Sequence, residues 1–488
     1  MSEPLLLGVD EGTTGVKAAL FDTRLRPVRE ARRDKVNRHP QPGWVEQDGE
    51  EVLRAVVEAV AEVLEDAPGE VVACGLDHQG ESVLAWDAES GAPLSPIVVW
   101  QDKRSQQVLD RMAGEEDEIR RRSGLPFDPY VSAAKLAWLL EHDEGVASAR
   151  EAGTLRMGTV DSFLCDRLGA GFATDASTAS RTQLHELGKP GFHPWLCERF
   201  GVPIDALPAV RDSVGELGTM RHASWPVERA LRGQVVDQQA ALAGAGCVVP
   251  GRVKATYGTG VFVLAHVGHE IPRPEGGLLP TVAWSIDGRT EYALDGGVFA
   301  AGAMLEWLCR ELGLAPDPAA LGRLAREAED SAGARVLPAL AGIGAPWWRP
   351  DARAVLAGLH GGTSSANVAR AALEGIAWRV ADIVAAIRET AEVESLRGDG
   401  GLTNEPLLLD LQADAIGAPV EAAGVDATVL GAAALAAVGA GVLSSLEEAA
   451  ELLPVERRVE PKRDDSWRKA EHERWRTFVK VAAELDAG

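Results

Sequence analysis

The stretch GVDEGTTGVK, residues 8–17, places Asp10, Gly12, Thr13 and Thr14 in one short turn at the end of an apolar run. A simple β-hairpin would explain it, because Glu11 and Gly12 can form the bend and residues 16–21 can return as the second strand. A phosphate-binding turn would explain it too. Small residues let backbone N–H groups approach an anion, threonine hydroxyls add donors, and Asp10 can hold the metal that accompanies phosphates. These residues alone leave both interpretations open.

The amino-acid composition limits the classes of protein to which the chain can belong. The chain has 488 residues, 46% of them hydrophobic, which is enough for two or more domains with substantial cores. Its net charge of −25 argues against a nucleic-acid partner and against a polybasic membrane contact. Five scattered cysteines without a C-x-x-C pair are typical of a reducing compartment. With no recognisable secretory signal, the sequence predicts a cytoplasmic protein that binds neither nucleic acid nor membrane.

Strands and helices alternate along the chain, which predicts an α/β architecture. Asp48 is expected to cap a long amphipathic helix, with Glu51 completing a capping box. The apolar run at residues 71–77 is expected to form a buried strand with the segment 82–87 as its hairpin partner. In the second half of the chain, helices are expected near residues 299–312, 366–391 and 427–442.

The glycine- and threonine-rich turn is repeated. Residues 251–268, GRVKATYGTGVFVLAHVG, again have the pattern of strand, turn and strand, so that TYGTG follows EGTTG after about 245 residues. The repeat suggests two related domains, each presenting a hairpin to a shared cleft. Because Pro250-Gly251 is a natural boundary, the domains are predicted to span residues 1–249 and 250–488. Chance recurrence of such hairpins is the alternative at this point.

Several longer motifs then indicate a family. YVSAAKLAWLL (130–140) and AVLAGLHGGTSSANVARAALE (354–374) resemble the two signatures of the FGGY carbohydrate kinases, and the resemblance is nearest to the glycerol kinases. The segments PGWVEQD, GTVDSFLCDRL, VVDQQAALAG, TYGTG, GVFAAGAMLEWL, GIGAPWW and DGG follow in family order, so the resemblance covers essentially the whole chain. It implies an α/β fold of two ribonuclease-H-like domains flanking a cleft, as in the actin, hexokinase and heat-shock-chaperone superfamily.

This resemblance implies a kinase that uses ATP and Mg²⁺ to phosphorylate a hydroxyl group of a small polyol or sugar. Such an enzyme needs in-line positioning, charge neutralisation and a base for the departing proton. Asp237 matches the family's catalytic base, although by its position in the sequence it could instead be a helix N-cap. Asp10 matches the residue that holds the metal. The family also implies a possible homodimer or homotetramer.

The resemblance assigns further residues to two substrate sites. The positions that match nucleotide-binding residues are Gly12, Thr13, Thr14, Thr259, Gly302, Glu306, Gly401 and Glu405. The positions that match acceptor-binding residues are Gly80, Glu81, Trp100, Tyr130, Asp237, Gln238 and Phe262. In the family, the polar members hydrogen-bond the hydroxyls of a polyol, and the tryptophan and phenylalanine form an apolar wall. The alternatives are plain core for the two aromatic residues, and a packing or turn role for Gly302 and Gly401.

Three positions depart from the glycerol kinases. Gly80 stands where those enzymes carry an arginine, which removes a charged donor and predicts a void beside Glu81 with room for a longer acceptor. Glu405 replaces an asparagine near the adenine, and Glu306 replaces a glutamine close by. We therefore expect the acceptor to be a four- or five-carbon polyol or ketose. Glycerol is the first alternative, and a non-catalytic sugar- or nucleotide-sensing protein is an alternative of another class.

Overall fold

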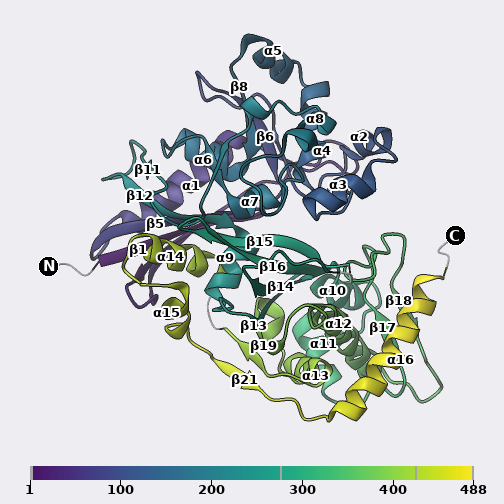
Figure 1. Ribbon diagram of the computed structural model, residues 1–488. Coiled ribbons are helices and arrows are strands. Elements are labelled where there is room, and N and C mark those ends of the chain that lie inside the picture. The colour runs from purple at the N-terminus through teal and green to yellow at the C-terminus, as the bar shows by residue number, and fades with distance from the viewer. Residues whose placement is uncertain (1–3, 275–276, 424–425, 486–488) are drawn as a thin grey trace.

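The computed structural model describes residues 4–274, 277–423 and 426–485, and two large mixed sheets form its two halves (Figure 1). The six-stranded first sheet has the order β11 (Thr219–Met220), β12 (Arg229–Val236), β5 (Glu70–His78), β1 (Pro4–Glu11), β2 (Gly15–Asp22) and β3 (Pro27–Asp34). The seven-stranded second sheet has the order β15 (Leu279–Ile286), β16 (Arg289–Val298), β14 (Val261–Gly268), β13 (Gly251–Tyr257), β19 (Val393–Asp399), β20 (Val420–Ala422) and β21 (Arg457–Val459).

The two sheets repeat one topology. In the first, β1 pairs antiparallel with β2 and parallel with β5, while β2 pairs antiparallel with β3 and β5 parallel with β12. In the second, β13 pairs antiparallel with β14 and parallel with β19, while β14 pairs antiparallel with β16 and β19 parallel with β20. The β1–β2 and β13–β14 turns are the EGTTG and TYGTG stretches. The predicted α/β fold of two related domains is thus confirmed.

Helices connect the strands and cover the sheets. Those of the N-terminal half are α1 (Gly49–Leu64), α2 (Gln106–Arg111), α3 (Glu116–Ser123), α4 (Ser132–His142), α5 (Glu144–Ala152), α6 (Val160–Arg167), α7 (Ala176–Ser180), α8 (Pro194–Phe200) and α9 (Asp237–Gly244). Those of the C-terminal half are α10 (Gly302–Arg310), α11 (Pro318–Ala325), α12 (Ser365–Ile387), α13 (Pro406–Ile416), α14 (Ala427–Gly439), α15 (Leu446–Glu451) and α16 (Asp465–Ala483). The three helices expected in the second half correspond to α10, α12 and α14. Within the described ranges, no helix combines the length and apolar character needed to cross a membrane.

The expected hairpin between residues 71–77 and 82–87 is wrong. Both edges of β5 are occupied, by β1 and β12, so β5 has no free edge for a further strand. The chain instead turns sharply after β5. The Ser82 amide donates to the Gly80 carbonyl at 2.7 Å, and Glu81 adopts a left-handed conformation with φ of 56°. The next strand joins a separate sheet of order β4 (Glu46–Gln47), β7 (Ile97–Val98), β6 (Val83–Asp87) and β8 (Leu155–Thr159).

Smaller elements complete the fold. They are the strand pairs β9 (Ala173–Asp175) with β10 (Ala209–Arg211) and β17 (Arg335–Leu337) with β18 (Val355–Ala357), and the 3₁₀ turns η1 (Ile204–Ala206) and η2 (Gly401–Asn404). α1 begins as predicted, since the Asp48 carboxylate accepts from the backbone N–H groups of Glu50 and Glu51 at 2.9 and 3.2 Å. The Glu51 carboxylate does not complete the capping box but accepts from Arg38 at 2.8 Å, because a charge-assisted bond is the stronger one.

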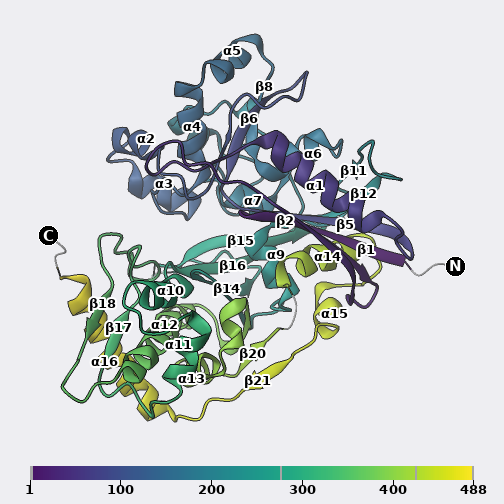
Figure 2. The ribbon, with the colours of Figure 1, turned by 180° about the vertical axis from the view of Figure 1, so that it is seen from behind.

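Helix α14 comes from the C-terminal half of the chain but packs against the first sheet (Figures 1 and 2). Glycines on three adjacent strands make this approach possible. A β-carbon on Gly75 of β5 would lie only 1.9 Å from the Ala432 carbonyl oxygen, and one on Gly8 of β1 only 2.3 Å from that of Val429. Gly233 of β12 meets the same helix, with 2.9 Å to its nearest backbone atom. At these glycines the helix backbone therefore lies directly on the sheet, while the Leu6 and Ala73 side chains of the sheet pack against α14 beside them.

Helices α9 and α14 approach each other in the same way. A β-carbon on Gly244 would lie 1.8 Å from the Ala427 carbonyl oxygen, and one on Gly431 would lie 1.8 Å from that of Ala240. α9 begins at Asp237, directly after β12. The close contact of the two helices therefore holds the N-terminal end of α9 at the junction of the two domains.

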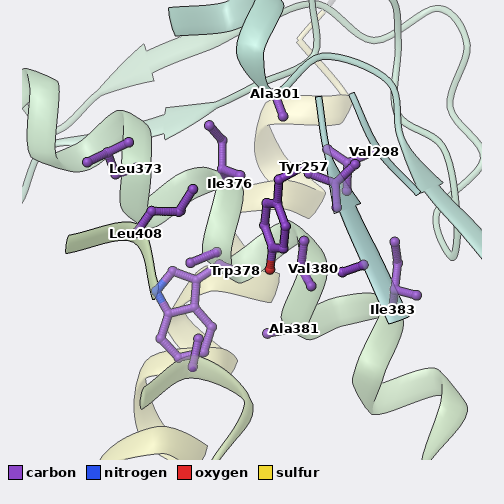
Figure 3. Close-up of a cluster of buried hydrophobic side chains, with 14 of the residues drawn as sticks. Tyr257, Val298, Ala301, Leu373, Ile376, Trp378, Val380, Ala381, Ile383 and Leu408 are labelled. Carbon is purple, nitrogen blue, oxygen red and sulfur yellow. The ribbon is translucent and has the colours of Figure 1, made fainter. Parts of the chain in front are cut away.

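The core of the second domain anchors the second hairpin. Tyr257, the last residue of β13, is fully buried beside Val298 and Ile376 (Figure 3). Its hydroxyl donates to Gln412 on α13 at 2.8 Å, so the buried polar atom is satisfied. Since Tyr257 immediately precedes Gly258, this anchor determines where the turn begins.

We predict that Gly75→Ala destabilises the protein by about 1–3 kcal/mol or more, because its β-carbon must displace a helix backbone rather than a flexible side chain. Gly361→Ala is the matched control, since a β-carbon there has no atom within 4 Å, and it should change stability by less than about 0.5 kcal/mol. Thermal unfolding followed by circular dichroism measures both. Equal melting temperatures for the two variants would contradict the close packing of α14.

Candidate active site

The first hairpin turn lies at the carboxyl end of β1. A β-carbon on Gly12 would lie 3.4 Å from Oδ1 of Asp10, so the turn folds back over this carboxylate. The Thr13 hydroxyl accepts a hydrogen bond from the Trp100 indole at 3.0 Å, whereas Thr14 is exposed. The structure thus brings a residue of the predicted acceptor wall into direct contact with the predicted phosphate turn.

Asp10 belongs to a cluster of carboxylates. Burial, followed by the nearby Asp426 and Asp237 carboxylates, raises the pKa of Asp10 to about 7, although a hydrogen bond with Asp77 acts in the opposite direction. Its register partner on β5 is Asp77, whose pKa is also raised well above the usual range by burial and by Asp10. Both Asp77 oxygens are buried and have no hydrogen-bond partner among the residues that the structure describes. This excess of negative charge fits a divalent cation.

Asp237 is the first residue of α9, and the N-cap position is occupied by Val236, so Asp237 does not cap the helix. Its Oδ1 accepts a hydrogen bond from the following backbone N–H at 2.7 Å. Burial and the Glu81 carboxylate raise the pKa of Asp237 to about 6, while His78 and Lys254 act in the opposite direction. Asp237 is therefore largely ionised at neutral pH and able to accept a proton.

Arg181 connects the polar residues that were predicted to bind the acceptor. Its Nε donates to the Glu81 carboxylate at 2.7 Å, and its Nη2 donates to the Tyr130 hydroxyl at 2.9 Å. The same Nη2 lies 3.1 Å from the Asp295 carboxylate on β16, so one guanidinium joins the two domains. The Tyr130 ring meets the Trp100 ring edge-on, with centroids 5.9 Å apart.

A buried lysine holds the backbone of the same residues. Lys135 donates to the Tyr130 carbonyl and, at 3.4 Å, to the Glu81 carbonyl, which also accepts from the Ser132 hydroxyl at 3.3 Å. Burial lowers the pKa of Lys135 to about 7. Glu81 is thus held at its carboxylate by Arg181 and at its backbone by Lys135, which maintains its left-handed conformation.

The space expected beside Glu81 is limited on one side, and how far it extends stays a prediction. A β-carbon on Gly80 would lie 2.8 Å from Cγ2 of Val236, so a buried methyl group occupies the direction that a side chain would take. Of the other predicted acceptor residues, Gln238 accepts from Lys254 at 2.8 Å, and Phe262 is half-buried on β14.

The second hairpin turn packs onto the N-terminal end of α10. The Thr259 carbonyl accepts from the amides of Ala301 and Ala303 at 2.8 and 3.1 Å, and the Gly258 carbonyl accepts from Gly302 at 3.1 Å. A β-carbon on Gly302 would lie 2.6 Å from the Gly258 oxygen, so this glycine allows close packing of helix and turn. The Thr259 side chain itself is exposed.

The remaining predicted nucleotide residues differ in their surroundings. Gly401 is exposed, and a β-carbon there would have no atom within 4 Å. Glu405 caps α13 by accepting from the Leu407 amide at 3.0 Å, and it pairs with Arg326. Glu306 is exposed on α10. Gly401 thus leaves open space, whereas Glu405 is engaged in local structure.

Three residues of this region were missed in the sequence. Asp77 ends VVACGLD as Asp10 ends PLLLGVD, and this parallel was a usable signal. Arg181 had no comparable signal, because it lies 100 positions from Glu81, and Lys254 had none, because it lies on the neighbouring strand β13 and its contact with Gln238 depends on the tertiary structure.

Comparison with known proteins agrees with this geometry. Residues 5–242 match the N-terminal domain, and residues 253–440 the C-terminal domain, of the FGGY family of carbohydrate kinases. The chain is 42% identical to a glycerol kinase of Alkalilimnicola ehrlichii over 447 residues, 90% of each chain. It is 38% identical to a glycerol kinase of Geobacter sp. (strain M21) over 488 residues, 98% of each chain. The domain boundary at residue 250 falls between the matched ranges and stays a prediction.

Solved structures share the fold. Plasmodium falciparum glycerol kinase with ADP superposes with a TM-score of 0.93 at 28% identity, over 98% of both chains. Gluconate kinase from Lactobacillus acidophilus superposes with a TM-score of 0.90 at 19% identity, over 99% of both chains. The resemblance found in the sequence is confirmed. The chain belongs to the FGGY family of carbohydrate kinases, enzymes that transfer a phosphoryl group from ATP to a hydroxyl group of a small polyol or sugar.

Proposed function

We propose that the acceptor is glycerol and that Asp237 is the general base of the phosphoryl transfer. The assignment of Asp237 as the base rests on its interactions with both the residues around Glu81 and the residues around Asp10. Its pKa is raised by Glu81 on the acceptor side, and its own charge raises the pKa of Asp10 on the phosphate side. A base for this reaction must lie between the acceptor and the phosphates.

The proposed chemistry requires little covalent work from the protein. The Asp237 carboxylate accepts the proton of the acceptor hydroxyl as the hydroxyl oxygen forms its bond to the terminal phosphorus of ATP and ADP departs. With a pKa of about 6, the carboxylate is ionised at neutral pH and still basic enough to take that proton. The hydrogen bond from the next backbone N–H fixes one carboxylate oxygen and leaves the other for the acceptor.

Recognition of the acceptor is assigned to Glu81, Tyr130 and Gln238, with Trp100 and Phe262 as the apolar wall. Contacts to buried cations support this assignment. Arg181 holds the Glu81 carboxylate and the Tyr130 hydroxyl, and Lys254 holds the Gln238 side chain, so these polar groups are oriented before the acceptor binds.

The nucleotide phosphates are assigned to the two hairpin turns, with Gly12, Thr13, Thr14 and Thr259 as the donors. Asp10 is the proposed ligand of Mg²⁺, and the orphaned oxygens of buried Asp77 beside it support a cation there. The cation, when bound, neutralises charge on the phosphates.

Two observations favour glycerol over the four- or five-carbon acceptor expected from Gly80. Both relatives with the highest similarity described above are glycerol kinases, at 42% and 38% identity. In addition, the Cγ2 methyl of Val236 lies 2.8 Å from where a β-carbon on Gly80 would be, which limits the space from which the preference for a longer acceptor was inferred. The longer polyol or ketose remains the second candidate, because position 80 still has no charged donor.

Asp237→Asn should lower turnover by roughly 10²–10⁴-fold, since the amide keeps the shape of the side chain but cannot accept the proton. The KM for the acceptor should change much less, because the amide still forms hydrogen bonds. Steady-state kinetics with glycerol and ATP measure both values, with the melting temperature as a control for folding. A variant with most of its turnover intact would refute the role of Asp237.

The pH dependence follows from the raised pKa of Asp237. The base must be ionised, so kcat/KM for glycerol at saturating ATP and Mg²⁺ should fall about tenfold per pH unit below pH about 6. Lys254→Met should move this acidic limb to higher pH, because the lysine charge lowers the pKa of Asp237. Glycerol does not titrate in this range. An acidic limb at the same pH in both proteins would contradict the assignment.

The choice of acceptor is tested by comparing kcat/KM for glycerol, erythritol, xylitol and xylulose. We expect glycerol to be preferred, and a preference for any longer acceptor would favour the second candidate. Gly80→Arg alone should impair all acceptors, because its β-carbon displaces Val236 next to Asp237. Gly80→Arg combined with Val236→Ala should favour glycerol over the longer acceptors by a further 10- to 100-fold, roughly the worth of a hydrogen bond to a charged group.

A further inference from the structure

Asp77 occupies the same place on β5 as Asp10 on β1. The two strands are parallel and hydrogen-bonded, and Asp10 and Asp77 are register partners. Side chains of register partners project from the same face of a sheet. Each aspartate is also the residue before the last of its strand, so both carboxylates lie at the carboxyl edge from which the phosphate turn departs.

Asp77 differs from the other buried carboxylates of the first domain. Asp175 accepts from the Ser177, Thr178 and Ser213 side chains or backbone, and Asp161 accepts from Thr159, Thr174 and Gln234. Asp77 is fully buried, yet no N–H or O–H group among the described residues donates to either of its oxygens, and the side chain within hydrogen-bonding reach of it is Asp10, itself a carboxylate. Burying an ionised carboxylate without partners lowers the stability of the fold by several kcal/mol. Asp77 therefore destabilises the protein unless a bound ligand, such as a cation, offsets this cost.

The charges around Asp77 do not compensate for this cost. The charged groups that raise the pKa of Asp77 are the carboxylates of Asp10, Asp237 and Asp426. The lysines of the region are bound to other groups: Lys17 pairs with Glu30 and Asp426, Lys35 pairs with Glu11, and Lys254 donates to Gln238. In the part of the chain that the structure describes, no lysine or arginine forms an ion pair with Asp10 or Asp77.

We propose that Asp77 is a second protein ligand of the divalent cation, which it binds together with Asp10. This inference rests on the proposed function, in which Asp10 alone is assigned to the metal. Mg²⁺ is typically bound by one or two carboxylates, with phosphate oxygens and water completing its octahedron. Within residues 4–274, 277–423 and 426–485, no group of three or more His, Cys, Asp or Glu side chains is placed to hold a metal. Asp10 and Asp77 would therefore be two side-chain ligands, with phosphate and water oxygens as the others.

The competing explanation is a structural one. In it, Asp77 is a protonated acid that donates to the Asp10 carboxylate, and the cation contacts Asp10 only. Asp77→Asn separates the two explanations, because the amide can replace a protonated acid as a donor but is a much weaker ligand for Mg²⁺ or Mn²⁺.

The test is a titration of nucleotide-free protein with Mn²⁺ alone, in which electron paramagnetic resonance measures the free ion. Asp77→Asn should weaken Mn²⁺ binding by at least about tenfold, as loss of a metal-site residue commonly does. Asp426→Asn is the matched control, because it removes a nearby negative charge that is half-exposed and paired with Lys17. Since asparagine also caps helices well, this variant should keep α14 intact and change the affinity by less than about threefold.

The melting temperature of the metal-free protein is the second measurement. Asp77→Asn should melt at the same temperature as the wild type or higher, because it removes a buried charge from among like charges. Unchanged Mn²⁺ affinity in Asp77→Asn, with or without a lower melting temperature, would overturn the proposal. If Asp10→Asn abolishes Mn²⁺ binding while Asp77→Asn does not, the proposed function stands and this inference alone fails. Each titration is done well below the melting temperature of the variant, so that a loss of affinity reports on the folded protein.

Discussion

The contact on which the arrangement of the site depends is between two pieces of backbone. Helix α14 meets glycines of β1, β5 and β12 backbone to backbone, and it meets α9 through Gly244 and Gly431 in the same way. Asp10 comes from β1, Asp77 from β5, and Asp237 from the start of α9. A single close-packed layer therefore sets the relative positions of the candidate metal ligands and the candidate base. Backbone packed on backbone has no rotamers to adjust, which makes these positions stiff.

Charge is distributed unevenly over the site. On the proposed acceptor side, Arg181 holds the Glu81 carboxylate and Lys135 its backbone carbonyl, so these polar groups are satisfied within the protein itself. On the proposed phosphate side, Asp10 and Asp77 have no cation of their own among the described residues. This difference in charge matches the difference between the two proposed substrates. A polyol brings no charge and needs donors and acceptors in fixed directions, whereas a nucleotide arrives with a cation that can take the place of a missing basic residue.

The sequence predicted correctly those features that are encoded by residues close together in the chain. The two hairpin turns were predicted because strand and turn signals lie within a few residues of each other, whereas Asp237 was singled out by the resemblance to the kinase family. The pairing of residues 82–87 was mispredicted, since local pattern does not reveal that both edges of β5 are already occupied. The contact between Gly80 and Val236 was missed for a similar reason, because Val236 is more than 150 positions away in the sequence. Partners brought by tertiary structure, such as Arg181, were invisible for the same reason.

The origin of α14 also matters while the protein is being synthesised. β12 ends at Val236 and α14 begins at Ala427, so about 190 residues separate the last main strand of the first sheet from the helix that covers it. At a ribosomal rate of about 5–20 residues per second, α14 is synthesised roughly 10–40 s after the glycine-lined face of the first sheet. The N-terminal half therefore cannot complete its packing as it emerges from the ribosome. Its bare sheet face is the surface most in need of protection by a chaperone during that interval.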